Sequence, residues 1–176
     1  TTMCPTELYA NTDEAPSLSL LPIETRSRRE SLAHLKHMPI EWCRVSLDPS
    51  DPRQLQESLK KLTETKLMPA VEAIELGLWN GEDASERHQL RPDGTVEVPT
   101  WRYAMVNYPH PLLQAGLTIL DTPGLNALGA EPELTLSVIP GAHAVMYLLA
   151  TDTGVTRSDL EIWQKHVQRH SNYHVA

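Results

Sequence analysis

The sequence predicts an α/β fold with a mostly parallel central sheet, and three observations carry this prediction. Residues 117–120 and 143–150 are nearly continuous apolar runs, which is typical of strands that are covered on both faces. A capping box at 156–159 begins a helix after the second run. Strands that alternate with loops and helices in this order indicate parallel crossover connections.

Two strands and a short helix are predicted before residue 50. Residues 5–10 read as a strand, and residues 41–47 alternate between two faces as a strand does. Residues 27–30 have the capping-box sequence Ser-Arg-Arg-Glu, which predicts a short helix that carries Leu32 and Leu35. These elements precede the first long helix of the chain.

A helix is predicted to begin at Asp51, because Asp is a preferred N-cap residue and Pro52 suits the first helical position. Its apolar stripe is expected to contain Leu55, Leu59 and Leu62. The stripe then loses phase, and it resumes at Leu67, Val71, Ile74 and Leu78. Because Pro69 disfavours helix at the residue before it, we predict two helices with a break at 65–69.

The chain is then predicted to return to the sheet. Residues 80–94 are polar and contain a Pro-Asp-Gly turn, which indicates a long loop or a hairpin connection. Residues 96–108 follow as a strand rich in Val, Thr, Trp and Tyr. A Pro-His-Pro turn at 109–111 leads toward the strand at 117–120, so we expect these two strands to form an antiparallel pair.

The strand at 117–120 ends in the turn Asp121-Thr122-Pro123-Gly124. A carboxylate at the carboxyl end of a buried strand lies where open α/β sheets bind ligands, and it suits a metal site. Gly124 lets a backbone N–H approach a phosphate closely, and Pro123 fixes φ just before it. An ordinary Asp-Thr-Pro-Gly turn explains the same residues, so on this motif alone both interpretations stay open.

The longer segment around this turn resembles a known family. From Leu117 onward the chain reads LTILDTPGLNALGAEPELTLSVIPGAHAVMYLLATDTGVTRSDLEIWQKHV. This is similar to the G3 region and the following strand and helix of bacterial dynamin-family GTPases. The resemblance implies a partial P-loop-type GTPase domain, in which Asp121 reaches Mg²⁺ through water and the N–H of Gly124 contacts the γ-phosphate of GTP.

The first six residues, TTMCPT, look like switch I of the same family. By this resemblance Thr2 contacts Mg²⁺ and, through its backbone, the attacking water, and it is the catalytic candidate. Thr1 is the competing candidate. The expected nucleotide site thus contains Thr1, Thr2, Asp121, Thr122, Pro123 and Gly124. Without the downstream motif, two threonines at a chain start would be interpreted as frayed and solvated.

Two motifs of such GTPases are absent from the sequence, the G-x-x-x-x-G-K-[ST] phosphate loop and the [NT]-K-x-D guanine-reading motif. We therefore expect residues 1–176 to be one truncated GTPase domain, an internal part of a larger GTPase that is inactive by itself. Residues 12–95 make the distance between switch I and G3 longer than a small Ras-like domain needs. This range is expected to be a helical and loop insertion of the dynamin-like branch.

Composition limits the possible partners and locations. The net charge of −8 and the lack of a basic cluster argue against nonspecific nucleic-acid binding. Two cysteines far apart fit a reducing compartment, so we expect a cytoplasmic protein. The sequence has no run of 18 apolar residues and no signal-peptide pattern, so any peripheral membrane contact is expected from regions outside this chain.

Metal sites built from histidine have little support in the sequence. His34 with His37, and His166 with His170, have spacings that could place two metal ligands on one helix face. No third ligand is evident and the H-E-x-x-H motif is absent, so structural histidines are expected.

Two functions from different classes follow. In the first, the parent protein is a dynamin-like GTPase that binds GTP and GDP with Mg²⁺. Hydrolysis would switch the loops at 1–6 and 121–131 and drive assembly, homodimerisation through the G domain or membrane remodelling. In the second, the chain is a nucleotide-free interaction module with a G-domain-derived fold. A translation- or ribosome-linked GTPase is a third interpretation, which fits the turn at 121–124 but not the long insertion.

Overall fold

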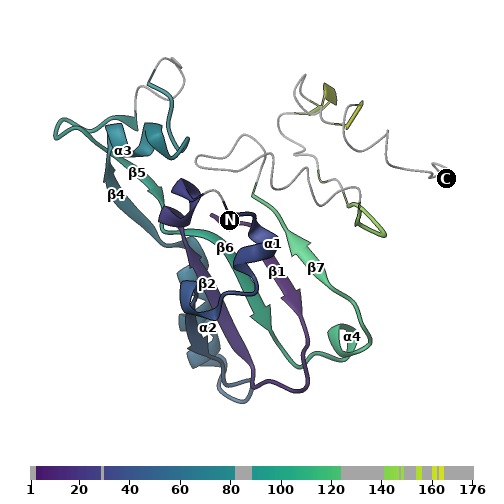
Figure 1. The fold of residues 1–176 in the computed structure, drawn as a ribbon. Coiled ribbons are helices and arrows are strands. Elements are labelled where there is room, and N and C mark those ends of the chain that lie inside the picture. The colour runs from purple at the N-terminus through teal and green to yellow at the C-terminus, as the bar shows by residue number, and fades with distance from the viewer. Residues whose placement is uncertain are drawn as a thin grey trace. The chain divides into compact units, whose positions relative to one another are not determined.

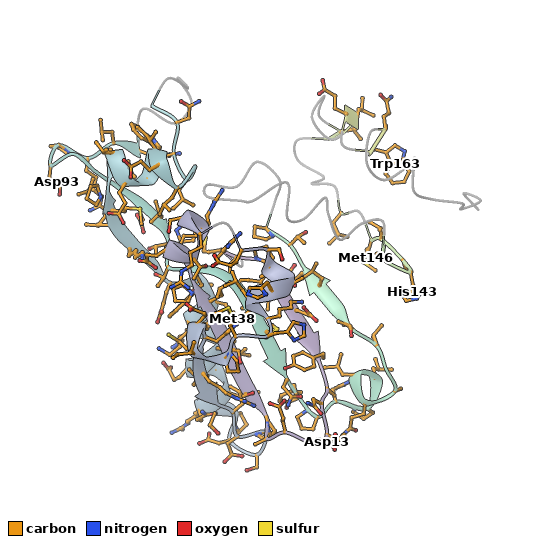
Figure 2. All side chains as sticks on the ribbon, viewed as in Figure 1. Asp13, Met38, Asp93, His143, Met146 and Trp163 are labelled. Atoms are coloured by element: carbon orange, nitrogen blue, oxygen red, sulfur yellow. The ribbon has the colours of Figure 1, made fainter. Side chains whose placement is uncertain are left out.

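The computed structural model describes residues 3–28, 30–81, 89–123, 141–146, 148, 154–155, 160–161 and 163–164. The chain divides into two compact units, Thr1–Ala130 and Glu131–Ala176, and each is described by itself. The described part of the first unit contains all of the strands named below. In this unit Asp13, at the turn between the first two strands, and Asp93, before the fifth strand, lie at opposite ends (Figure 2).

The first unit is built on a mixed five-stranded sheet with the strand order β3-β2-β6-β1-β7 (Figure 1). Its strands are β1 (Thr6–Tyr9), β2 (Ser17–Pro22), β3 (Cys43–Ser46), β6 (Trp101–Asn107) and β7 (Ile119–Asp121). The α/β class is thereby confirmed. Among the strands that the structure describes, however, only the β1–β6 pair is parallel, and β2–β3, β2–β6 and β1–β7 are antiparallel, so the mostly parallel character is seen only in part.

Short helices connect these strands. They are η1 (Ile23–Ser27), α1 (Leu32–Leu35), η2 (Pro39–Glu41), α2 (Pro52–Lys60), η3 (Lys61–Thr63), α3 (Ala70–Glu75) and α4 (Pro111–Gln114). The predicted start of α2 is confirmed, because the Asp51 carboxylate accepts hydrogen bonds from the backbone N–H groups of Arg53 and Gln54. The predicted capping box at 27–30 is wrong. Ser31 caps α1, whereas the Ser27 hydroxyl donates to the Glu24 carbonyl at the end of η1.

The predicted two helices with a break at 65–69 are confirmed as α2 and α3, and the residues of the break form a strand. Residues 65–69 form strand β4 (Thr65–Pro69), which pairs antiparallel with β5 (Thr95–Pro99) in a separate two-stranded sheet. The alternation of burial explains the strand, because Met68 is 3% exposed while Leu67 is 49% exposed. Helix α3 then begins at Ala70 and buries Ala73, whereas two residues of the predicted stripe, Val71 and Ile74, are exposed.

The long strand predicted at 96–108 is divided at Thr100. The residues before Thr100 form β5 in the two-stranded sheet, and those after it form β6 in the five-stranded sheet. We call residues 65–81 and 89–99 the small lobe, which contains β4, α3 and β5; these elements lie together beyond one end of β6 (Figure 1).

Strand β7 pairs with β1 and not, as predicted, with the strand before the Pro-His-Pro turn. The described neighbours of β6 are β1 and β2, which occupy both of its edges. Burial on both faces of the 117–120 segment is also a wrong prediction for this structure, because Leu117 and Ile119 are 46% and 45% exposed. Their exposure follows from the position of β7 at the edge of the described sheet.

Two hydrophobic cores lie in the first unit. The core of the five-stranded sheet is closed by α2 and consists of Cys4, Leu18, Leu20, Leu47, Leu62, Ala104 and Val106, with Leu55 and Leu59 packed against it. This confirms the predicted apolar stripe of α2. The core of the small lobe consists of Ile23, Met68, Ala73, Leu78, Trp79, Val96 and Val98. The two sets have no residue in common.

The described residues of the second unit do not bear out two predictions. Residues 143–146, within the predicted strand at 143–150, have no strand partner among the residues that the structure describes. Leu160 and Trp163, expected on a buried helix face, are 49% and 37% exposed. The helix predicted at 132–138 and the capping box at 156–159 lie outside the described residues. Within the described ranges, no helix is long and apolar enough to cross a bilayer.

Asn107 fastens the end of β6 to the connection between β1 and β2. It is 3% exposed, its side-chain oxygen accepts from the Asn11 N–H at 2.8 Å, and its side-chain nitrogen donates to the carbonyls of Asn11, Glu14 and Ala15. Sequence analysis did not identify this residue, because its partners are distant in sequence. Removing the amide would leave partly buried backbone groups of Asn11, Glu14 and Ala15 without these partners.

We expect Asn107→Ala to lower the free energy of unfolding by about 1–3 kcal/mol, the cost of unsatisfied buried polar groups. Urea unfolding followed by circular dichroism measures this change. Asn11→Ala is the matched control, because the side-chain hydrogen bonds of Asn11 to Glu14 and to the Asp13 N–H are exposed. An equal loss in both variants would contradict the role of the buried amide.

Candidate functional site

The pairing of β1 with β7 brings together the two segments that the sequence marks as functional. Asp121, the last residue of β7, is the register partner of Thr6, the first residue of β1. Because the strands are antiparallel, the carboxyl end of β7 lies beside the amino end of β1. The turn that begins at Asp121 therefore lies next to the chain start, although Thr1, Thr2 and Gly124 themselves are outside the described residues.

The described residues of the turn differ in burial. Asp121 is exposed, Thr122 is half-buried and Pro123 is buried. Burial of Pro123 fixes the direction of the chain after the strand, while the Asp121 carboxylate stays accessible to solvent. This arrangement presents an acidic group at the end of a strand, as the sequence predicts.

The chain-start segment, residues 3–6, is held in place by the sheet and by η3. The Met3 N–H donates to the Leu62 carbonyl at 3.2 Å, and the Ala104 N–H donates to the Pro5 carbonyl at 2.9 Å. The Thr6 hydroxyl donates to the Cys4 carbonyl at 3.1 Å, and the Cys4 side chain is 2% exposed in the main core. Sequence analysis predicted the strand but not these anchors.

Cys4 lies near Asp121, because the strand register sets Asp121 opposite Thr6. The pKa of the Cys4 thiol is raised to about 12, chiefly by burial; the hydrogen bond with Thr6 lowers this pKa, and the negative charge of Asp121 contributes to raising it. A buried thiol with this pKa stays protonated at neutral pH, so it is not an activated nucleophile.

The donor set around Asp121 fits Mg²⁺ in an open site. Among the described residues, no group of three or more His, Cys, Asp and Glu side chains could hold a metal ion, and His34 and His37 belong to no such group. Mg²⁺ is usually bound by one or two carboxylates together with water and substrate phosphates. An accessible carboxylate followed by Thr122 provides hard oxygen donors of this kind.

A polar cluster that sequence analysis missed joins α1 to the sheet. The Glu7 carboxylate accepts from the Lys36 ammonium and, at 3.0 Å, from the Tyr103 hydroxyl. The Lys36 nitrogen lies 5.1 Å from the centre of the Tyr103 ring. Burial, together with the charge of Glu7, raises the pKa of the Tyr103 hydroxyl. The cluster holds β1 and β6 in place from the α1 side.

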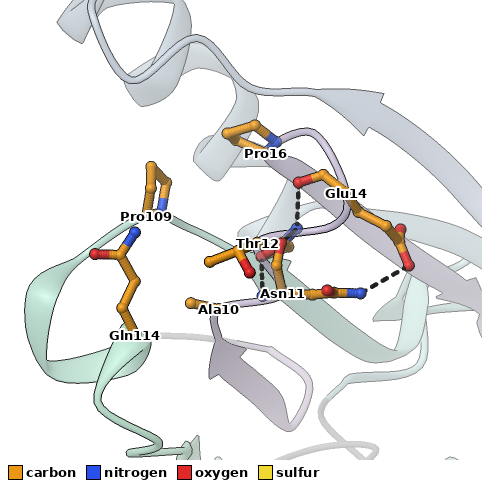
Figure 3. Close-up of a pocket in the computed structure, with 8 residues that line it drawn as sticks. Ala10, Asn11, Thr12, Glu14, Pro16, Pro109 and Gln114 are labelled. Carbon is orange, nitrogen blue, oxygen red and sulfur yellow. Dashed lines mark hydrogen bonds between the residues drawn. The ribbon is translucent and has the colours of Figure 1, made fainter.

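Two of the cavities in the first unit are lined by residues that the structure describes. One, of about 260 Å³, lies at the end of β1 opposite Asp121 and is lined by Asn11, Thr12, Glu14, Asn107 and Gln114 among others (Figure 3). The other, of about 370 Å³, is lined by Met3, Thr65, Gln89, Arg91 and Glu97. The second cavity therefore lies between the chain-start segment and the small lobe.

Comparisons with known proteins identify the family. The family model described as the dynamin family matches residues 1–175, so this chain belongs to the dynamin family. This confirms the resemblance seen at 117–167 and the P-loop-type GTPase fold class.

Two relatives agree with this assignment over shorter segments. A bacterial dynamin-like protein of Nostoc punctiforme is 30% identical over 86 residues, which are 49% of this chain and 12% of that protein. The isoniazid-induced protein IniA of Mycobacterium tuberculosis is 43% identical over 60 residues, which are 33% of this chain and 9% of that protein. The matched part of this chain thus spans a small part of either relative.

We expect Asp121→Asn to lower the pKa of the Cys4 thiol, because the substitution removes the negative charge that raises it. The chemical shift of the Cys4 β-carbon as a function of pH, followed by nuclear magnetic resonance on protein with isotopically labelled cysteine, measures the shift. The exposed Cys43 serves as an internal reference. Asp48→Asn is the control, since Asp48 is not among the groups that shift Cys4; an equal shift in both variants would contradict the proximity of Asp121.

Proposed function

We propose that this chain supplies switch I and the G3 motif of a dynamin-like GTPase that binds GTP with Mg²⁺ and hydrolyses it. The β1–β7 register is the observation that carries this proposal, since it brings the end of β7 beside the residues that precede β1. Membership of the dynamin family supports the same assignment. Phosphoryl transfer depends on positioning and on charge stabilisation, and such a site needs groups from both segments.

The residues of the two segments have distinct proposed roles. Asp121 holds Mg²⁺ through water, and the N–H of Gly124 contacts the γ-phosphate. Thr2 supplies the switch I hydroxyl and orients the attacking water through its backbone, with Thr1 as the competing candidate. When bound, Mg²⁺ neutralises the charge that develops on the phosphate oxygens. Thr122 and Pro123 fix the path of the chain between the acid and the glycine.

The phosphate-cradling loop and the guanine-reading motif are proposed to lie in parts of the protein outside this chain, so that the chain alone is inactive. The small share of the relatives' length that it matches, 12% and 9%, supports this proposal. Hydrolysis would then release the loops at 1–6 and 121–131 from the γ-phosphate, an order-to-disorder switch.

We further propose that this switch drives assembly through a G-domain homodimer and membrane remodelling, with peripheral membrane contact made by other regions of a cytoplasmic protein. The printed name of the Nostoc punctiforme relative, a bacterial dynamin-like protein, supports this direction. The net charge of −8 favours nucleotide and protein partners over nucleic acid.

The test is titration of fluorescent GTP and GDP with Mg²⁺ against the full-length protein and against this chain alone. We expect binding only by the full-length protein. Asp121→Ala in that protein should lower the rate of GTP hydrolysis by about 100-fold or more, the order seen when one charge-stabilising group is removed from an active site. Phosphate release measures the rate.

Asp13→Ala is the matched control, because Asp13 is an exposed acid beyond the opposite end of β1 (Figure 2). Hydrolysis should be unchanged in this variant. Full activity of Asp121→Ala would contradict the assigned role of Asp121. Absence of nucleotide binding by the full-length protein would contradict the GTPase and favour the nucleotide-free interaction module.

A further inference from the structure

The small lobe has its own hydrophobic core. The seven residues of that core come from β4, α3, β5, the segment that follows α3 and η1, and none of them belongs to the core under the five-stranded sheet. The two sheets likewise share no strand pairing among the described residues. Because the two cores share no residue, the lobe can change orientation with little loss of core packing, although Ile23 of η1 joins the core of the lobe from outside it.

The connections between the two bodies meet at one place. Thr100 is the single residue between β5 and β6. Its N–H donates to the carbonyl of Glu64, which precedes β4, at 3.0 Å, and its carbonyl accepts from the Ile23 N–H, at the start of η1, at 3.1 Å. The β2–β6 ladder also shifts register between Leu21 and Pro22. Because the chain passes between the five-stranded sheet and the small lobe at one place, small changes in a few backbone dihedrals there can rotate the lobe relative to the sheet.

Exposed side-chain contacts also span this junction: the Lys66 ammonium pairs with the Glu24 carboxylate of η1, and the Arg26 guanidinium donates to the Gly77 carbonyl at 3.4 Å. The Trp101 indole N–H donates to the Glu64 carboxylate at 3.2 Å, and this bond is exposed. The Arg102 guanidinium donates to the Thr25 carbonyl at 3.0 Å and is partly buried. Exposed hydrogen bonds exchange readily with water, so the Trp101–Glu64 contact opposes rotation weakly.

The junction is connected to the chain-start segment. The Met3 N–H donates to the carbonyl of Leu62, which lies just before Glu64, and Cys4 packs with Leu62 in the main core. Met3 also lines the cavity of about 370 Å³ together with residues of the small lobe. The buried side-chain oxygen of Gln89, which lines this cavity, has no hydrogen-bond partner among the described residues. This cavity leaves space into which the small lobe can move toward the chain-start segment.

We propose that the small lobe rotates about the Thr100 junction when the chain-start segment engages its ligand, so that α3 takes a different orientation relative to the five-stranded sheet in the two ligand states. Movement of Met3 and Cys4 displaces Leu62, and Glu64 passes this displacement to Thr100. The inference rests on the proposed function, because it takes GTP as the ligand that moves the chain start.

The test is the distance between two spin labels in the full-length protein, with cysteines outside this chain replaced. One label is attached to Cys43, which is exposed on β3, and the other to Val71→Cys on α3, where Val71 is 70% exposed. Cys4 is buried and is not expected to be labelled. The distance distribution is compared in GDP and in a non-hydrolysable GTP analogue.

We expect the Cys43 to Val71→Cys distance to differ between the two nucleotides. The control pair is Cys43 with Leu112→Cys on α4, where Leu112 is 60% exposed. Neither of these labels lies in the small lobe, so the distance between them should not change. Nucleotide binding by both labelled proteins is measured first with fluorescent GTP. Binding with an unchanged Val71→Cys distance would overturn the inference and leave the proposed function intact, whereas absence of binding would overturn both.

A hinge variant gives a second test. Trp101→Phe keeps an aromatic ring but removes the indole N–H that bonds to Glu64. We expect it to bind GTP normally and to broaden the Cys43 to Val71→Cys distance distribution, because the junction loses one restraint. A distribution identical to that of the parent protein would contradict the assigned hinge.

Discussion

The antiparallel pairing of β1 with β7 is the constraint on which the rest of the account depends. It places the register partners Thr6 and Asp121 side by side, although more than a hundred residues separate them in the chain. The intervening chain builds the rest of the five-stranded sheet and the small lobe, and it returns through α4 to the edge of β1. An acidic residue and a chain-start segment that are remote in sequence thereby lie side by side.

The same segment that meets Asp121 is also bonded to η3, which leads into the small lobe. Residues 3–6 contact the sheet through Pro5 and η3 through Met3, and Cys4 lies in the main core next to Leu62. In the proposed function, the ligand acts on a segment that is held by both the sheet and η3. In the proposed rotation, the displacement of the chain start reaches the small lobe at Thr100, because the strands on either side of this residue, β5 and β6, belong to different sheets.

Local chemistry made part of the fold predictable from the sequence. Asp51 with Pro52 defined the start of α2 correctly, and its leucine stripe was assigned correctly because helical periodicity is a local property. Strand pairing is not a local property of the sequence. The Pro-His-Pro turn predicted that β7 pairs with β6, whereas β1 lies between these two strands and pairs with both. The Asn107 clamp and the Glu7–Lys36–Tyr103 cluster join residues distant in sequence, so no spacing rule identifies them. The residue types of the turn at 121–124 indicated Asp121 as a candidate site residue. Its position near Cys4 could not be predicted, because that position depends on the β1–β7 register.

Disulfide trapping tests the β1–β7 register most directly. In a background with Cys4→Ala and Cys43→Ser, the pair Leu8→Cys and Ile119→Cys occupies directly opposed positions on one face of the sheet, so oxidation should join the two residues. The pair Leu8→Cys and Leu120→Cys is the control, because a shift of one residue points the second side chain to the other face. Mass spectrometry of non-reduced peptides should find the first disulfide and little of the second. Preferential formation of the second would contradict the register and, with it, the site built on Asp121.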